Sequence, residues 1–227
     1  DTPLLPFQQL FFDRDLAEAH HWNQSVLLKA AAPLHAGHLQ QALLALVTHH
    51  DALRLTFTRQ GAAWVANHRS LAEQQRQPSL LWQADVADDA ALQALAEQAQ
   101  RSLDLSQGPL LRAVLANLAD GRQRLLLVIH HLVVDGVSWR ILLEDLQQAY
   151  EQLHAGQALK LPAKTSATQA WARRLQAHAD SAPMQAQLAF WTTQLQGARQ
   201  DLPCDRPHGE LHNRHAQQVQ TRLDKEQ

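Results

Sequence analysis

The stretch VIHHLVVDGVSW, residues 128–139, places two histidines, His130 and His131, at the end of an apolar run. Successive residues of a β-strand point to opposite faces, so only one of the two imidazoles can enter a given cavity while the other packs or forms hydrogen bonds. Four residues after His131, Asp135 and Gly136 turn the chain into a segment with helical spacing. Sites collect at the carboxyl ends of strands in α/β sheets, so this stretch is the first candidate for chemistry.

Two other interpretations of this stretch stay open from spacing alone. Asp135 can serve as the N-cap of the following helix, a common role for Asp, with Gly136 as a turn residue. A metal site would need at least one further ligand, and H-H-x-x-x-D lacks the i, i+4 spacing of helical zinc motifs. No bound metal is therefore expected here.

The apolar run before the histidines also predicts the fold. Residues 124–129 have the continuous apolar pattern of a central strand that is covered on both faces. Elsewhere the apolar periodicity alternates between the strand and helix rules, which predicts a mixed α/β (α+β) fold with a mixed sheet and flanking helices. Strands are expected at 22–28, 53–58, 62–67, 80–86, 111–118, 124–129 and from 217 to 223, and helices at 39–50, 88–103, 136–156, 168–179 and 186–196. Trp139, Trp171 and Trp191 are expected in the core.

Composition limits the function classes. The chain has 227 residues with 45% hydrophobic content, and its 20 Lys plus Arg nearly balance 22 Asp plus Glu, so no basic field draws in nucleic acid or an anionic membrane. Cys204 is alone, which excludes an internal disulfide, and no apolar run is long enough to span a bilayer. A cytoplasmic location is expected. Because the chain starts at Asp1 without an initiator Met, it is expected to be part of a longer protein.

Two other histidine pairs occur in the chain. His49 and His50 close a helix, where a cation at the negative end of the macrodipole is favourable, and His50 continues the apolar face. His20 and His21 precede the first strand, with no Cys or carboxylate at ligand spacing. Both pairs are expected to be structural, and lining of a substrate channel is the alternative for His20 and His21.

The histidine motif resembles that of a known family. His130, His131, Asp135 and Gly136 stand as H-H-x-x-x-D-G, which resembles the signature of the condensation-domain superfamily of nonribosomal peptide synthetases, relatives of chloramphenicol acetyltransferase. Other segments are similar to family segments in the expected order: PFQQLFF at 6–12, HHDALRLTF at 49–57 with His49 and Asp51 in place of the usual Arg and Glu, LDLSQGPLLRAVL, TSATQAWARRL and LPCDRP. The resemblance covers nearly the whole chain and implies a chloramphenicol acetyltransferase-like lobe.

Two segments resemble the epimerization branch of this family. HHWNQSVLL at 20–28 is similar to the opening strand of epimerization domains, and VVDGVSWRILLEDL at 133–146 resembles their version of the histidine motif. Condensation domains more often carry a Ser before the Asp and a D-G-W-S type of continuation. Epimerization is therefore favoured over peptide-bond formation. A non-catalytic platform that recruits a partner enzyme is a third hypothesis, although such domains tend to lose the motif that is intact here.

The resemblance implies a reaction and roles for named residues. The implied substrate is an aminoacyl or peptidyl thioester on the 4′-phosphopantetheine arm that a carrier domain supplies, with no directly bound cofactor, and the α-carbon is converted from L to D. His131 is the implied acid or base on one face, with a glutamate of the second lobe opposite it. His130, Asp135 and Gly136 are implied to support the motif, and Arg54 is expected to pair with a buried, ionised Asp135. Trp22, Asn23, Gln24 and Ser138 are candidates for the substrate channel, but alternation along the strand means that some of Trp22, Asn23 and Gln24 must face the core instead.

The expected domain organisation limits what this chain does alone. Residues 1–175 are expected to form the N-terminal lobe, and residues 176–227 connecting helices and the start of a second lobe. The family's E-G-H-G-R-E motif, which carries the glutamate, does not occur in the sequence, so these 227 residues are expected to fold but to lack activity. The implied partners are the missing C-terminal lobe, a peptidyl carrier domain and neighbouring adenylation and condensation domains. The identity of the substrate amino acid stays open.

Overall fold

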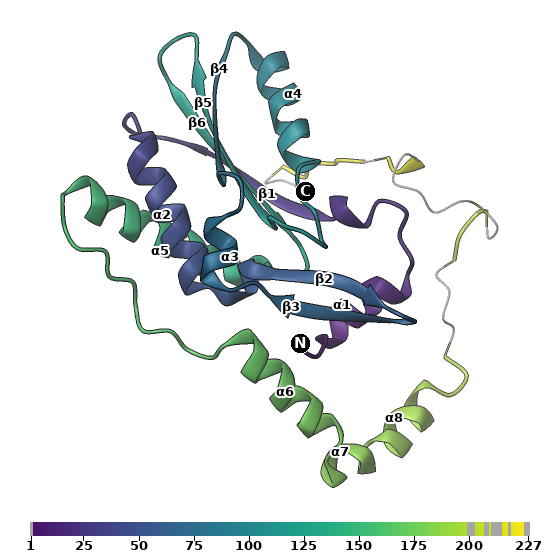
Figure 1. Ribbon diagram of the computed structural model, residues 1–227. Helices are drawn as coiled ribbons and strands as arrows, with labels where there is room; N and C mark the ends of the chain where they lie inside the picture. The colour runs from purple at the N-terminus through teal and green to yellow at the C-terminus, as the bar shows by residue number, and fades with distance from the viewer. Residues whose placement is uncertain (1, 199–202, 207–208, 210–214, 218, 225–227) are drawn as a thin grey trace. The chain divides into compact units, whose positions relative to one another are not determined.

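The computed structural model describes residues 2–198, 203–206, 209, 215–217 and 219–224 of the chain (Figure 1). The chain forms two compact units, Asp1–Ser181 and Ala182–Gln227. The first unit contains α1 (Pro6–Asp13), the 3-10 turn η1 (Ala19–His21), β1 (Asn23–Lys29), α2 (Ala36–His49), the 3-10 turn η2 (Asp51–Arg54), β2 (Leu55–Gln60), β3 (Ala63–His68), α3 (Leu71–Gln75), β4 (Leu81–Val86), α4 (Asp89–Gln100), β5 (Leu111–Leu118), β6 (Gln123–His130), α5 (Gly136–His154) and α6 (Thr168–Ala179). The second unit contains α7 (Ala182–Ala186) and α8 (Leu188–Leu195). Whether the second unit begins a second lobe stays a prediction.

The main sheet is mixed, as the sequence predicts. Its strand order is β1-β6-β5-β4, and β6 runs antiparallel to both of its neighbours whereas β4 and β5 are parallel. The strand that ends at the histidine pair is therefore an interior strand. A tight turn joins β5 to β6, where Gly121 adopts a φ of 81° and the Asp120 carboxylate accepts a hydrogen bond from the backbone N–H of Arg122 at 2.9 Å. The positive φ explains the glycine, because residues with a Cβ rarely adopt it.

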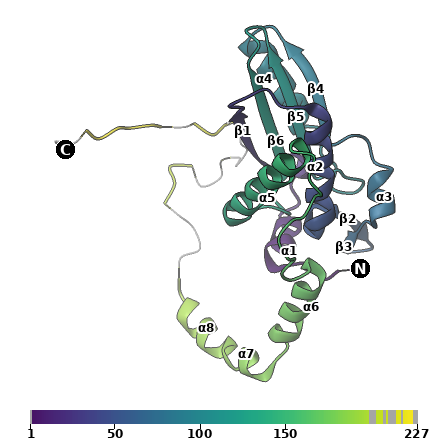
Figure 2. The ribbon, with the colours of Figure 1, turned by 90° about the vertical axis from the view of Figure 1, so that its left-hand side faces the viewer.

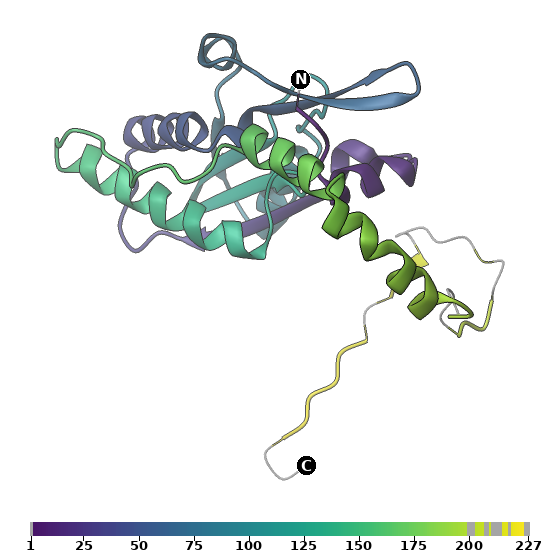
Figure 3. The same ribbon diagram turned by 90° about the horizontal axis from the view of Figure 1, so that it is seen from below.

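Helices cover both faces of this sheet. α2 and α5 lie side by side on one face, as Figures 2 and 3 show, where Leu125, Leu127 and Ile129 of β6 pack in the core that they share. On the opposite face, Leu126 and Val128 pack against residues of α4 and the turn after it. Burial of each such Leu or Val contributes roughly 1.5–3 kcal/mol, so both faces of β6 stabilise its place in the interior of the sheet.

A smaller core joins α1 to the β2–β3 hairpin. Phe11 and Phe12 of α1 are buried there with Phe57 of β2 and Leu132, the second residue after β6. The ring of Phe12 also stacks on Trp64, with 4.2 Å between ring centroids. This core fixes the N-terminal helix next to the end of β6, although the sequence predicts the segment of α1 only as a family motif and not as a helix.

Three expectations about the fold are wrong. The predicted strand at 217–223 is not formed by the residues that the structure describes there, 217 and 219–223. Residue 218 lies outside the described residues. Trp171 and Trp191 are 49% and 55% exposed, because α6 buries only Ala172 and α8 buries none of its residues. Trp139 is partly buried against the main core, as expected. Among the described residues, no helix combines the length and apolar character that crossing a membrane requires.

Candidate active site

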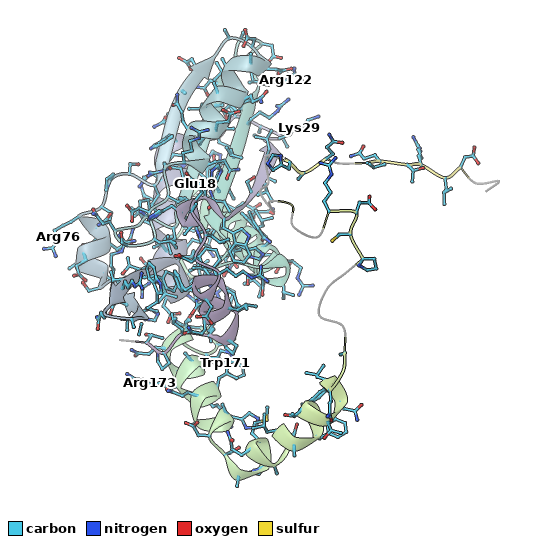
Figure 4. The ribbon with its side chains drawn as sticks, turned by 90° about the vertical axis from the view of Figure 1, so that its right-hand side faces the viewer. Glu18, Lys29, Arg76, Arg122, Trp171 and Arg173 are labelled. Atoms are coloured by element: carbon cyan, nitrogen blue, oxygen red, sulfur yellow. The ribbon has the colours of Figure 1, made fainter. Side chains whose placement is uncertain are left out.

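A cavity of about 530 Å³ opens beside the end of β6. The segment around α1, the turn after β6 and the starts of α5 and α6 form its walls, and most of the lining side chains are apolar. Trp171 reaches it from α6, and Figure 4 shows Trp171 and Arg173 extending from opposite sides of that helix. The residues that line it are Leu5, Phe7, Gln8, Trp22, Ala52, Leu55, His131, Leu132, Val133, Val134, Asp135, Ser138, Ser166, Thr168 and Trp171.

His131 is the histidine of the pair that lines this cavity. Its backbone N–H donates to the carbonyl oxygen of Trp22 at 2.8 Å, and its ring lies tilted against the Trp22 indole with 4.5 Å between ring centroids. Its Nδ1 is 2.9 Å from the carbonyl oxygen of Val134, and its Nε2 is 3.2 Å from the side-chain nitrogen of Gln24. A carbonyl oxygen can only accept, so Nδ1 carries a proton and Nε2 of the neutral ring has the lone pair.

His130 has the opposite environment. Its side chain is fully buried, and its ring meets the edge of Phe11 at 5.8 Å between centroids. Nε2 donates to the carbonyl oxygen of Ala19 at 2.9 Å, and Nδ1 accepts from the backbone N–H of Leu132 at 3.2 Å. Burial lowers the pKa of His130 to about 4, because the charged form loses its hydration, and the hydrogen bond to Ala19 opposes this effect only in part. His130 is therefore a neutral structural residue.

Gln8 ties the N-terminal helix to the same turn. Its side-chain nitrogen donates to the carbonyl oxygen of Leu132 at 3.1 Å, and its side-chain oxygen accepts from the backbone N–H of Leu5 at 2.9 Å. Gln8 is almost completely buried. The sequence contains a signal for this contact, because Gln8 belongs to the PFQQLFF segment, but the partner of its side chain is distant in sequence.

Asp135 caps a helix instead of pairing with a cation. It is exposed, and its Oδ1 accepts from the backbone N–H of Ser138 at 2.7 Å and from its hydroxyl at 2.6 Å. The hydroxyl of Ser138 is the main reason that the pKa of Asp135 lies below its ordinary value. Gly136 is the first residue of α5, and among the described residues only neighbouring backbone would surround a Cβ there. The expectation of a buried Asp135 is wrong.

Arg54 binds the end of a helix and not Asp135. Its guanidinium donates to the carbonyl oxygens of Val47 and Thr48, at 2.6 and 2.8 Å, and to that of Arg69 at 3.2 Å. The last carbonyls of α2 lack intrahelical partners, and a nearby arginine satisfies them. The predicted pairing of Arg54 with Asp135 is therefore wrong.

Two of the four predicted channel residues line the cavity. Trp22 and Ser138 line the cavity. Asn23 does not, because it pairs with His130 across the strands and its amide donates to the carbonyl oxygen of Gln100 on α4 at 2.8 Å. Gln24 is not a lining residue either, since its amide lies between His131 and Trp139. For Asn23 and Gln24 the channel prediction is wrong, because strand alternation turns Asn23 toward α4 and the amide of Gln24 is held by Trp139 and His131.

A second polar cluster lies at the end of α2. His50 Nε2 is 2.7 Å from Asp145 Oδ2, and burial lowers the pKa of His50 although Asp145 opposes this. Within the described residues, His49, His50 and Asp145 are the one group of three whose potential metal-ligand atoms lie within 4.8 Å of one another. The hydrogen bond of His50 to buried Asp145 joins α2 to α5, a structural contact that differs from the expected cation at the helix end.

Asp51 fixes the start of α6, a role that sequence patterns do not reveal. It is nearly buried and accepts from Lys164 Nζ at 2.8 Å and from the backbone N–H of Thr168 at 3.0 Å. Burial alone would raise the pKa of Asp51, but the hydrogen bond and charge of Lys164 and the Thr168 N–H together hold it below its ordinary value. The anchored helix carries Trp171 to the cavity, so Asp51 supports one wall.

Comparison with solved structures defines the class of fold. The chain is similar to the epimerization domain from the third module of tyrocidine synthetase B, with 35% identity and a TM-score of 0.80 over 89% of this chain and 46% of that one. It is also similar to the first condensation domain of the calcium-dependent antibiotic synthetase, with 22% identity and a TM-score of 0.73 over 87% of this chain and 48% of that one. The fold is the chloramphenicol acetyltransferase-like lobe of these domains, as expected.

Sequence comparison then identifies the family. The family model described as "Condensation domain" matches residues 1–227. The chain is 42% identical over 210 residues to a component protein of the linear gramicidin synthase of Brevibacillus parabrevis, and 40% identical over 211 residues to one of the plipastatin synthase of Bacillus subtilis. These matches cover 91% and 92% of this chain but only 3% and 8% of the two synthase proteins. The chain belongs to the condensation-domain family of nonribosomal peptide synthetases.

Proposed function

We propose that this chain is the N-terminal lobe of an epimerization domain. The domain inverts the α-carbon, from L to D, of an aminoacyl or peptidyl thioester carried by a peptidyl carrier domain. The observation that best supports a proton-transfer function is the position of His131, whose ring lines the cavity. Main-chain groups bind both ring nitrogens of His130. The choice of epimerization is supported by the 35% identity to an epimerization domain, against 22% to a condensation domain.

The cavity is suited to an acyl thioester on a long, thin arm. An α-proton is far less acidic than an imidazolium, whose reference pKa is about 6.5, so the thioester must be polarised as the base acts. Mostly apolar walls strengthen each electrostatic interaction inside, because they lower the local dielectric constant. His131 serves one face of the α-carbon, and the glutamate that the family resemblance implies in a second lobe serves the other. Exposed Asp135 takes no part in proton transfer.

The same proposal assigns partners and limits activity. The 4′-phosphopantetheine arm comes from the carrier domain, and adenylation and condensation domains lie next to it in a cytoplasmic synthetase. These 227 residues alone hold one of the two proton-transfer groups and are expected to be inactive. Racemization of a carrier-bound aminoacyl thioester by this chain alone would contradict the proposal.

The test uses a complete domain that contains this chain. An L-aminoacyl carrier domain is incubated with it, the thioester is hydrolysed, and chromatography on a chiral phase measures the D fraction. We expect the D isomer to accumulate with the unsubstituted domain and not with His131→Asn. Retention of the L isomer by the unsubstituted domain would contradict epimerization.

Condensation is the second candidate, and a specific observation favours it. The matching family model is that of condensation domains, and solved condensation domains share the fold. The same assay distinguishes the two functions when a second carrier domain loaded with an acceptor amino acid is added. A dipeptidyl carrier with unchanged chirality would assign condensation.

A further inference from the structure

Gln24 lies between two rings in a series of hydrogen bonds. It is on β1 opposite Ile129, so its side chain extends to the face of the sheet that α5 covers. Trp139 Nε1 donates to Gln24 Oε1 at 2.8 Å, and Gln24 Nε2 is 3.2 Å from His131 Nε2. An indole N–H can only donate, so it fixes which end of the amide is the oxygen. The amide N–H of Gln24 therefore faces His131.

This arrangement selects one state of the His131 ring. The carbonyl oxygen of Val134, 2.9 Å from Nδ1, requires a proton on Nδ1. The amide N–H of Gln24 requires a lone pair on Nε2. Both requirements are met only by the neutral ring with its single proton on Nδ1. A second proton on Nε2 would set two N–H groups against each other.

We propose that Gln24, oriented by Trp139, is a positioning residue that holds His131 as the neutral base for the first proton transfer. This inference rests on the proposed epimerization. In that step the α C–H bond breaks, its proton moves to His131 Nε2, and its electron pair enters the thioester carbonyl to form an enolate. A carboxylic acid, the group that the family resemblance implies in the second lobe, returns a proton to the opposite face.

The geometry also explains how the substrate reaches Nε2. The group that lies 3.2 Å from Nε2 is a side-chain amide, which can rotate away from the ring when the substrate arrives. When Nε2 gains the α-proton, it no longer accepts from Gln24. The contact therefore favours the ring before proton transfer and not after it. Gln24 does not line the cavity, so it acts through His131.

The first test reads the protonation of His131 in this chain by NMR of ¹⁵N-labelled histidine. We expect the neutral ring to carry its proton on Nδ1. In Gln24→Glu a carboxylate oxygen replaces the amide nitrogen and accepts from Nε2–H, so the doubly protonated ring should be more populated than in the unsubstituted chain at the same pH. Gln83→Glu adds the same charge at an exposed position of β4 and should leave the His131 signals unchanged.

The second test uses the pH–rate profile of the complete domain. Gln24→Glu should move the acid limb of kcat to higher pH, so that the rate lost at neutral pH is recovered at higher pH. A residue that only shaped a channel would change KM and leave the profile in place. Trp139→Phe frees the amide to turn its oxygen toward Nε2 and should move the profile in the same direction.

These tests separate the inference from the function on which it rests. If the NMR response occurs but the complete domain does not epimerise, the proposed function fails and the positioning role of Gln24 remains. If His131 has the same protonation in Gln24→Glu as in the unsubstituted chain, the inference is overturned. If Gln24→Glu does not fold, Gln24→Leu is the second variant, because it removes the amide N–H that faces His131. If His131 takes up its second proton at the same pH in Gln24→Leu as in the unsubstituted chain, the inference is also overturned.

Discussion

Acidification should destabilise the chain through one buried residue, His130. The ring is fully buried, and its Nδ1 accepts from the backbone N–H of Leu132. A second proton on the ring would therefore set N–H against N–H in a site without water contact. Burial lowers the pKa of His130 to about 4 for this reason, from an ordinary value of 6.5.

The sign and size of the effect follow from these two values. Because the folded-state pKa is below that of the unfolded chain, the unfolded chain binds this proton more readily. The contribution of His130 is fully present above pH 6.5 and is lost as the pH falls from 6.5 toward 4. The interval from 6.5 to about 4 corresponds to about 3 kcal/mol of unfolding free energy.

Urea unfolding at pH 7 and pH 4 measures this contribution. His130→Asn keeps an acceptor near Leu132 but has no titrating ring, so it should be less stable at pH 7 and should lose about 3 kcal/mol less than the unsubstituted chain on acidification. With a urea slope of about 2 kcal/mol per molar, this difference is about 1.5 M in the midpoint. His21→Asn, on an exposed residue, is the matched control and should follow the unsubstituted chain.

Equal acid-induced losses in the unsubstituted chain and in His130→Asn would refute this reasoning. If His130→Asn does not fold, the ring signals of His130 in the unsubstituted chain provide the second measurement. They should titrate near pH 4. Titration close to 6.5 would show that the ring is not sealed and would refute the assignment of its hydrogen bonds.

Three further changes have distinct expected results. In a complete domain, His131→Asn should lower the rate of D-isomer formation by about 10²–10⁴-fold while the domain still folds, and an unchanged rate in the folded variant would contradict its role as the base. Asp51→Asn should lower the unfolding free energy by about 2 kcal/mol, whereas Asp85→Asn at an exposed position should cost less than about 0.5 kcal/mol, as urea unfolding would show. Because the pKa of Asp51 lies below its ordinary value, the contribution of Asp51 to stability is present at neutral pH and is lost as the pH falls through that lowered pKa. Equal losses of unfolding free energy in Asp51→Asn and Asp85→Asn would contradict the role of Asp51 at the start of α6. Asp135→Ala should cost about 1 kcal/mol and Asp135→Asn much less, since both Asp and Asn cap helices; equal costs would argue against capping.

Local patterns predict the elements of this fold well. The expected strand 111–118 and helix 168–179 have the bounds of β5 and α6. The expected apolar face of the first long helix is the buried face of α2. These elements are defined by alternation or by helical spacing over many residues, which the sequence displays directly. α1 has only eight residues and begins after Leu5, which offers no capping side chain, so its pattern is too short to identify.

Sequence patterns do not predict which side chains of distant segments contact one another. Arg54 is predicted to pair with Asp135, but it binds the carbonyls at the end of α2, which need partners wherever the helix ends. Gln24 is predicted to line the substrate channel. Only the position of Trp139 on α5 shows that the amide of Gln24 faces His131. The motif residues themselves can be identified, because alternation at the end of a strand is a local property.

The two adjacent histidines have opposite tautomers, and this difference explains why the proposed function assigns proton transfer to the second. Both ring nitrogens of His130 are bound to main-chain groups, a carbonyl at Nε2 and an N–H at Nδ1, so neither can be offered to a ligand without breaking the fold. His131 has a main-chain carbonyl at Nδ1 but a side chain, Gln24, at Nε2. A side chain can rotate away where a backbone cannot. Exchanging the two roles would therefore require moving the turn after β6 itself, and not just its side chains.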